Sequence, residues 1–222
     1  MDWGVGMSRA YFRLEGVLVD AGPARFAYWM ALRSQHLGDR VTGLATVVAG
    51  FAFRPRGPLS DGATARRLTF GALRGTSEDR LAELGMDYGR DVLLEGLRPA
   101  GWDLWERARA SGLRRVLVAE HPDGALDAIV ERLAPDEVVA NRFEVVRGRL
   151  SGRLIDPVVG GLDGAWLRGH AGGSADGCTV YGSQIDDAPL MSAAEACVAV
   201  HPDRGLRSLA RDCGWPIVEA GA

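Results

Sequence analysis

The chain has 222 residues, which suffices for one sizeable α/β domain, alone or with an inserted subdomain. Its 26 Lys plus Arg against 29 Asp plus Glu give a net charge of -3, so no basic excess indicates nucleic acid as a partner. The longest mostly apolar run, residues 41–53, is too short to span a bilayer, and we expect no transmembrane segment.

The first predicted element is a buried strand over residues 10–19, a mostly apolar run that contains Arg13 and Glu15. Residues 23–97 change to helical spacing, which indicates an all-helical insertion interrupted by an irregular, proline-rich stretch. Within it, Thr76 with an aspartate three positions later is typical of a helix start. The predicted domains are therefore a core made of residues 9–21 and 99–222 and a helical cap made of residues 22–98.

Beyond the insertion, helices and strands alternate as expected for a Rossmann-like parallel sheet, so the predicted fold class is α/β. Ligands of such sheets bind beyond the carboxyl ends of the strands, so the loops after Val17, Val118 and Tyr181 define the predicted site. The predicted helices are 102–111, 124–133, 188–194 and 204–213, the predicted strands are 116–118, 137–140, 179–181, 197–200 and 216–218, and residues 143–154 alternate like a hairpin.

Several segments carry a family resemblance. Residues 11–20, YFRLEGVLVD, are similar to the first motif of the haloacid dehalogenase (HAD) superfamily, and residues 114–123, RRVLVAEHPD, resemble its second-motif strand. Residues 139–154 and 180–219 resemble the corresponding segments of the phosphoserine-phosphatase-like subgroup, the latter covering its fourth motif and C-terminus. The resemblance implies the HAD fold, which is a Rossmann-like core with an inserted helical cap.

The residues on which the family's phosphatase chemistry depends are replaced in this sequence. In the family, the first-motif aspartate attacks phosphorus and ligates magnesium, and the aspartate two residues later acts as general acid and base. The resemblance places Arg13 and Glu15 at these positions. An arginine offers no lone pair as a nucleophile, and its fixed charge would repel magnesium. The other degenerate positions are Val17 for the motif threonine, Ala119 for the second-motif hydroxyl, Gly164 for the third-motif lysine and Ser183 for the leading fourth-motif acid, with Asp187 retained.

These replacements lead us to expect a pseudophosphatase, a binding, scaffolding or regulatory module that has no catalytic residues and has lost magnesium. Its partner would be an unknown protein or small molecule, bound in the old cleft or at a cap surface that includes residues 41–53. Two alternatives stay open: a metal-independent enzyme that uses the remaining acid-base groups, and a magnesium-dependent phosphomonoesterase with its motifs elsewhere. The candidate cleft residues are Arg13, Glu15, Glu120, His121, Gln184 and Asp187, with no metal ligands among them.

The lost metal leads to a structural prediction. A buried Asp187 without a cation would be costly, so we predict an ion pair with Arg13 and place Glu15 in the same polar network. Glu120 and His121, without a third ligand nearby, are interpreted as part of a solvated loop. The three cysteines follow no metal-ligand spacing and the N-terminus does not resemble a secretory signal, so we expect reduced thiols in a cytoplasmic protein.

Overall fold

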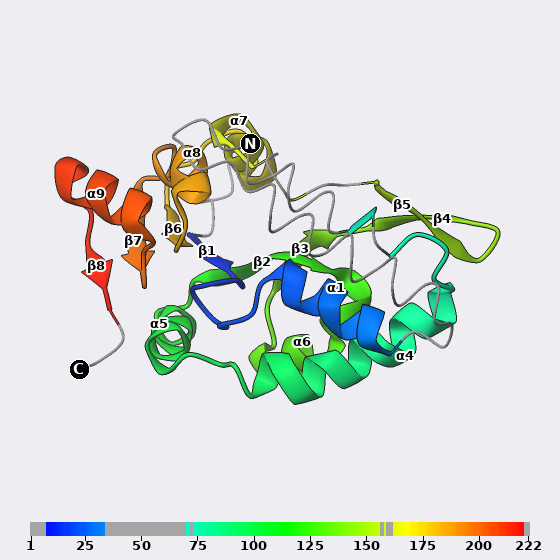
Figure 1. Ribbon diagram of the computed structural model, residues 1–222. Helices are drawn as coiled ribbons and strands as arrows, with labels where there is room; N and C mark the ends of the chain where they lie inside the picture. The colour runs from blue at the N-terminus through cyan, green and yellow to red at the C-terminus, as the bar shows by residue number, and fades with distance from the viewer. Residues whose placement is uncertain (1–7, 34–69, 72, 156–157, 159–161, 220–222) are drawn as a thin grey trace.

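The computed structural model describes residues 8–33, 70–71, 73–155, 158 and 162–219. A six-stranded sheet runs through the molecule in the order β3-β2-β1-β6-β7-β8, and all of its pairings are parallel (Figure 1). This arrangement confirms the predicted α/β fold with a Rossmann-like sheet. The strands are β1 (Arg9–Arg13), β2 (Arg114–Pro122), β3 (Glu137–Asn141), β6 (Cys178–Gly182), β7 (Ala196–Val200) and β8 (Ile217–Val218).

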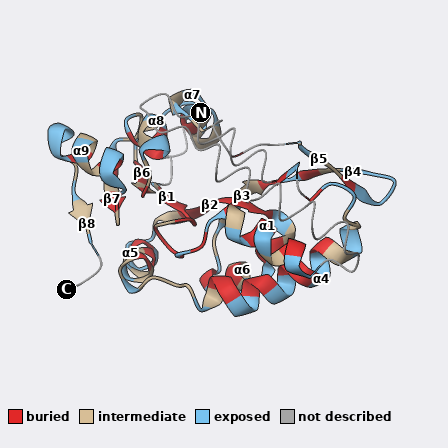
Figure 2. Cartoon of the chain, viewed as in Figure 1, coloured by how far each residue is buried: buried red, intermediate tan, exposed pale blue. Residues whose placement is uncertain are grey.

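Helices cover both faces of the sheet, so its central strands are buried (Figure 2). Side chains alternate along β1: Phe12 joins one apolar cluster with Trp105, whereas Tyr11 joins a second cluster with Leu167. The helical elements are α1 (Pro23–Leu32), α4 (Glu78–Tyr88), the π-helix η1 (Gly89–Leu94), α5 (Pro99–Ala110), η2 (Asp123–Ala125), α6 (Asp127–Leu133), α7 (Gly164–Ala171), η3 (Ile185–Asp187), α8 (Ala188–Met191) and α9 (Arg204–Cys213). Among the described residues, no helix is long and apolar enough to cross a membrane.

The first strand is shorter than predicted. The prediction of a strand over 10–19 is wrong beyond Arg13, because β1 ends there and the chain makes tight turns. Gly16 adopts a φ of +83°, which favours glycine, and the amides of Leu18 and Val19 both donate to the carbonyl of Leu14. The run is apolar because these turns are buried under α5, not because they belong to the sheet.

Close packing fixes this turn against α5. A Cβ added to Gly101 would lie 2.1 Å from the carbonyl oxygen of Val17, so only glycine allows the helix to approach so closely. The chain beside the turn is joined to the end of the helical insertion by two backbone hydrogen bonds, from Asp20 to Gly96 and from Arg98 to Leu18. The first turn, the insertion and α5 therefore meet at one place.

Most remaining elements lie within a few residues of their predictions. The hairpin is formed by β4 (Phe143–Val146) and β5 (Arg149–Leu154). The N-cap predicted at Thr76 lies one residue later, at Ser77, whose hydroxyl accepts the amide of Arg80, so that α4 begins at Glu78. Residues 41–53 lie outside the described part of the chain, and the division into core and cap stays a prediction.

Candidate functional site

Polar side chains from three neighbouring strands meet at the carboxyl end of the sheet. Arg13 is the last residue of β1 and pairs in register with Val118 of β2, so Glu120 follows at the same edge. The loop after β6 brings Ser183 and Asp187 to this edge as well. Parallel pairing thus brings Arg13 next to residues that are 107 or more positions away from it in sequence.

Arg13 lies between two carboxylates. Its Nη2 is 2.6 Å from Oε1 of Glu120, and its Nε is 2.9 Å from Oδ1 of Asp187. The residue is only 6% exposed. Burial acts to lower the pKa of Arg13, but the charges of Asp187 and Glu120 outweigh it and raise the pKa above its usual value. The predicted Arg13–Asp187 ion pair is confirmed, and we call these three residues the Arg13 network.

Asp187 is held from a second side by the backbone of its own loop. Its Oδ2 accepts the amides of Ser183, at 2.8 Å, and Gln184, at 3.0 Å. The Gln184 side chain in turn accepts the backbone amide of Asp187, which closes a capping box at η3. Both carboxylate oxygens of Asp187 are therefore engaged, one by Arg13 and one by the loop.

Glu15 forms a second buried cluster beside the Arg13 network. Its Oε1 accepts the backbone amides of Glu120 (2.8 Å) and His121 (2.9 Å) and lies 2.7 Å from Nδ1 of His121. Nε2 of His121 is 3.2 Å from the hydroxyl of Tyr88, the last residue of α4. Burial acts to raise the pKa of Glu15, but the His121 hydrogen bond and the charges of His121 and Arg13 lower it to about 2. Glu15, His121 and Tyr88 thus link the sheet to the helical insertion.

The interpretation of Glu120 and His121 as a solvated loop is wrong. Both belong to β2, which runs four residues past the predicted end at Val118, and they are 2% and 0% exposed. Asn141 at the end of β3 holds this extension: its side-chain amide donates to the carbonyl of Glu120, and its Oδ1 accepts the amide of Val158 at 2.8 Å.

The other predicted positions are spread around this edge. Val17 and Ala119 are fully buried apolar residues, and Ser183 donates its hydroxyl to the carbonyl of His201 at 3.1 Å. Gly164 opens α7, where an added Cβ would lie 2.6 Å from that of Ala193.

Sequence reasoning missed Tyr88 and Asn141. Asn141 carried a usable signal, since it is a polar residue that directly follows the predicted strand 137–140. Tyr88 carried none, because its spacing within a helical stripe is that of any core residue.

Comparison with known proteins identifies the family of this chain. The sequence model of haloacid dehalogenase-like hydrolases matches residues 16–192. The chain belongs to this family. It is 27% identical to a putative hydrolase of Mycobacterium leprae over 94% of this chain and 71% of the relative. A phosphoserine phosphatase of Mycobacterium tuberculosis is also 27% identical, over 94% of this chain and 69% of that protein.

Solved structures agree on the HAD fold. A Bordetella pertussis protein of unknown function superposes with a TM-score of 0.78 at 23% identity, covering 96% of this chain and 98% of that one. A phosphoserine phosphatase in its apo form gives a TM-score of 0.66 at 15% identity, covering 97% and 94% of the two chains. At these identities the likeness concerns the fold alone.

We call the carboxyl edge of the sheet around Arg13, Glu15 and Asp187 the HAD site. Its residues do not fit the magnesium ion that the family implies. Two carboxylates at this edge, those of Glu120 and Asp187, each lie within 3 Å of the guanidinium of Arg13. A divalent cation among them would face a fixed positive charge in a buried, poorly screened place. The sequence also contains no lysine, since all 26 of its Lys plus Arg are arginines, so it offers no lysine for the third-motif position.

Asp203 joins the start of α9 to the loop that carries Asp187. Its Oδ1 accepts the amide of Leu206 at 2.8 Å and caps α9, and its Oδ2 accepts the amide of Ile185 at 3.1 Å. We expect Asp203→Ala to lower the free energy of unfolding by about 1–2 kcal/mol in urea denaturation, because it loses a helix cap. Asp203→Asn keeps a capping oxygen and should lose less; equal losses would contradict this assignment.

Proposed function

We propose that this chain is a HAD-family protein without magnesium-dependent phosphatase activity, retained as a binding or regulatory module. The observation that carries the proposal is the position of Arg13, whose guanidinium pairs with both Glu120 and Asp187. One cation thereby takes the place of the nucleophile and neutralises the charges that a metal would neutralise. A guanidinium cannot attack phosphorus, because it has no available lone pair at any accessible pH.

The neighbouring positions support the same proposal. Ala119 offers no hydroxyl to a phosphoryl oxygen, and it is fully buried in the apolar cluster. Glu120 would repel a phosphate dianion that entered the site. Several catalytic positions of the family are thus replaced at one site. This favours a site that has changed as a whole over one that tolerates a single substitution.

The test is an assay for phosphate release from p-nitrophenyl phosphate and from phosphoserine, with and without magnesium. We expect no magnesium-dependent turnover, and a rate for the wild type equal to that of Asp187→Asn. Isothermal titration with magnesium alone should likewise give no saturable heat. Magnesium-dependent turnover that disappears in Asp187→Asn would overturn the proposal.

A second candidate function rests on the chain of contacts from Glu15 through His121 to the Tyr88 hydroxyl. A carboxylate, an imidazole and a hydroxyl in series are the parts of a metal-independent nucleophilic site. Here, however, the Tyr88 side chain is fully buried, and burial raises its pKa, so its hydroxyl is a poor and inaccessible nucleophile. The candidate therefore ranks second. Ester hydrolysis that persists in EDTA and disappears in Tyr88→Phe would favour it.

A further inference from the structure

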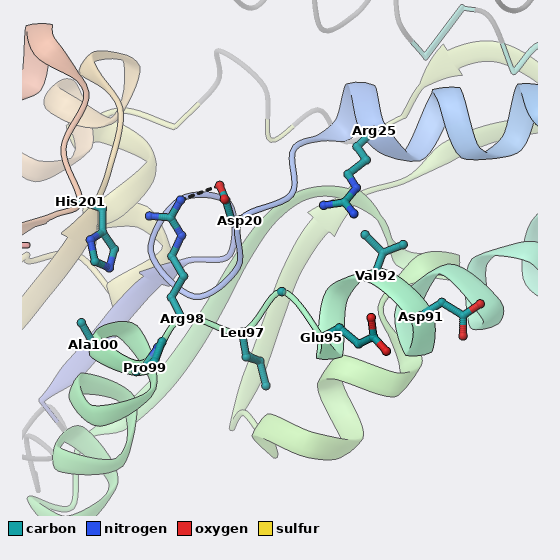
Figure 3. A pocket seen from close by; sticks show the side chains of 11 residues that line it. Asp20, Arg25, Asp91, Val92, Glu95, Leu97, Arg98, Pro99, Ala100 and His201 are labelled. Carbon is teal, nitrogen blue, oxygen red and sulfur yellow. Dashed lines mark hydrogen bonds and ion pairs between the residues drawn. The ribbon is translucent and has the colours of Figure 1, made fainter. Parts of the chain in front are cut away.

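A cavity of about 820 Å³ lies where the two segments that join the helical insertion to the sheet run side by side (Figure 3). One segment follows the first turn and the other precedes α5. Val19 and Leu97 form an antiparallel bridge between them, and the Arg98 guanidinium pairs with Asp20 at 2.6 Å. We call this space the hinge cavity. It is lined by neither Arg13, Glu15 nor Asp187, so it is separate from the HAD site.

The charges that line the hinge cavity fall into two groups. Arg98 and Asp20 neutralise one another. Arg25 on α1, Asp91 on η1 and Glu95, which directly follows η1, are exposed, and their side chains make no hydrogen bond or ion pair with any described residue. Figure 3 shows the Arg25 side chain extending from α1 into the space between Asp20 and η1. One cation and two anions are thus available to a ligand.

The wall between these charges is partly apolar. Val92 and Leu97 contribute aliphatic surface to the lining, and Val92 lies between Arg25 and Glu95 in Figure 3. A purely anionic ligand would face the carboxylates of Asp91 and Glu95, and a purely cationic one would face Arg25. The lining is complementary to a molecule that carries both charges on a short aliphatic chain.

We propose that the hinge cavity binds a short aliphatic molecule with one carboxylate and one ammonium group. The carboxylate pairs with Arg25, the ammonium pairs with Asp91 or Glu95, and the chain between them lies against Val92 and Leu97. Because the lining comes from both joining segments and from two helices of the insertion, an occupant ties these elements together. This proposal stands apart from the one above, since it concerns a different place and requires no statement about phosphatase activity.

The experiment titrates the wild-type protein calorimetrically with the ω-amino acid series from glycine to 6-aminohexanoate, which varies the distance between the two charges. Butyrate and butylammonium serve as single-charge probes of similar size. We expect saturable binding of at least one member of the series, about tenfold tighter than either single-charge probe, since each lost charged hydrogen bond costs about that factor. If no member binds, the proposal is wrong.

Matched variants locate the binding. Arg25→Gln and the double variant Asp91→Asn/Glu95→Gln should each weaken the best probe by about tenfold. Arg168→Gln, which changes an exposed arginine on α7 that does not line the hinge cavity, should leave the affinity unchanged. All of these positions are exposed, so the variants are expected to fold. Binding that none of the cavity variants weakens would also overturn the proposal. Neither result depends on whether the protein hydrolyses phosphate esters.

Discussion

Replacement of Arg13 by leucine should lower the free energy of unfolding by about 3–5 kcal/mol, the cost of breaking a buried ion pair from one side. The substitution leaves Glu120 and Asp187, which are both almost completely buried, without the cation that faces them. Urea denaturation at neutral pH, followed by far-UV circular dichroism, measures the loss.

Arg98→Leu is the matched control for this substitution. Arg98 also pairs with a carboxylate at 2.6 Å, but the side chain of its partner, Asp20, is 79% exposed. An exposed pair contributes about 1 kcal/mol or less, so the control should lose far less stability. A neutral triple variant, Arg13→Met/Glu120→Gln/Asp187→Asn, should recover part of the Arg13→Leu loss, because it removes the uncompensated charges. Equal decreases in the free energy of unfolding for Arg13→Leu and Arg98→Leu would show that burial of the Arg13 network does not increase its contribution to stability.

Acid should destabilise the protein through Glu15. Its pKa falls from an ordinary 4.5 to about 2 in the folded state, so folding favours the ionised form. The associated stability, about 3 kcal/mol, is fully present above pH 4.5 and is lost as the pH falls from 4.5 towards 2. The free energy of unfolding, measured at a series of pH values across this window, checks the sign and the size.

Two glutamine variants separate this effect from general acid unfolding. Glu15→Gln should flatten the acid limb, because the titrating group is gone, although the variant starts from a lower stability. Glu144→Gln is the control: hydrogen bonds from Ser151 and Arg153 also lower the pKa of Glu144, but that side chain is solvated. Its acid limb should stay closer to that of the wild type than the acid limb of Glu15→Gln does. An unchanged slope in Glu15→Gln would contradict the assignment.

The sequence allowed most of the fold and one decisive contact to be predicted. The alternation of short apolar runs with helical spacing sufficed for the parallel sheet, because each of those patterns is local. The Arg13–Asp187 pair could be predicted because a buried carboxylate that has lost its metal requires another cation. That reasoning needs only the family register, which brings the two positions to the same sheet edge.

The parts that could not be predicted depend on long-range partners. The extension of β2 through Glu120 and His121 depends on β3 and on Asn141, and no local pattern reveals that a polar pair is buried. The first turn was mistaken for a strand because burial under α5 makes its residues as apolar as a strand would be. Tyr88 reaches His121 because α4 packs against η2, which directly follows β2.

Because the sequence contains no lysine, the side-chain charges of the protein change less in base than in acid. Arginine keeps its proton in any solution in which proteins are handled, so no cationic side chain of the Arg13 network is lost on alkaline titration. The groups that remain for base to titrate are mainly thiols and phenols, and burial raises the pKa of Tyr11, Tyr88 and Tyr181. The charges of the Arg13 network therefore stay almost constant from neutral pH upward, and its carboxylates are the groups through which they change in acid.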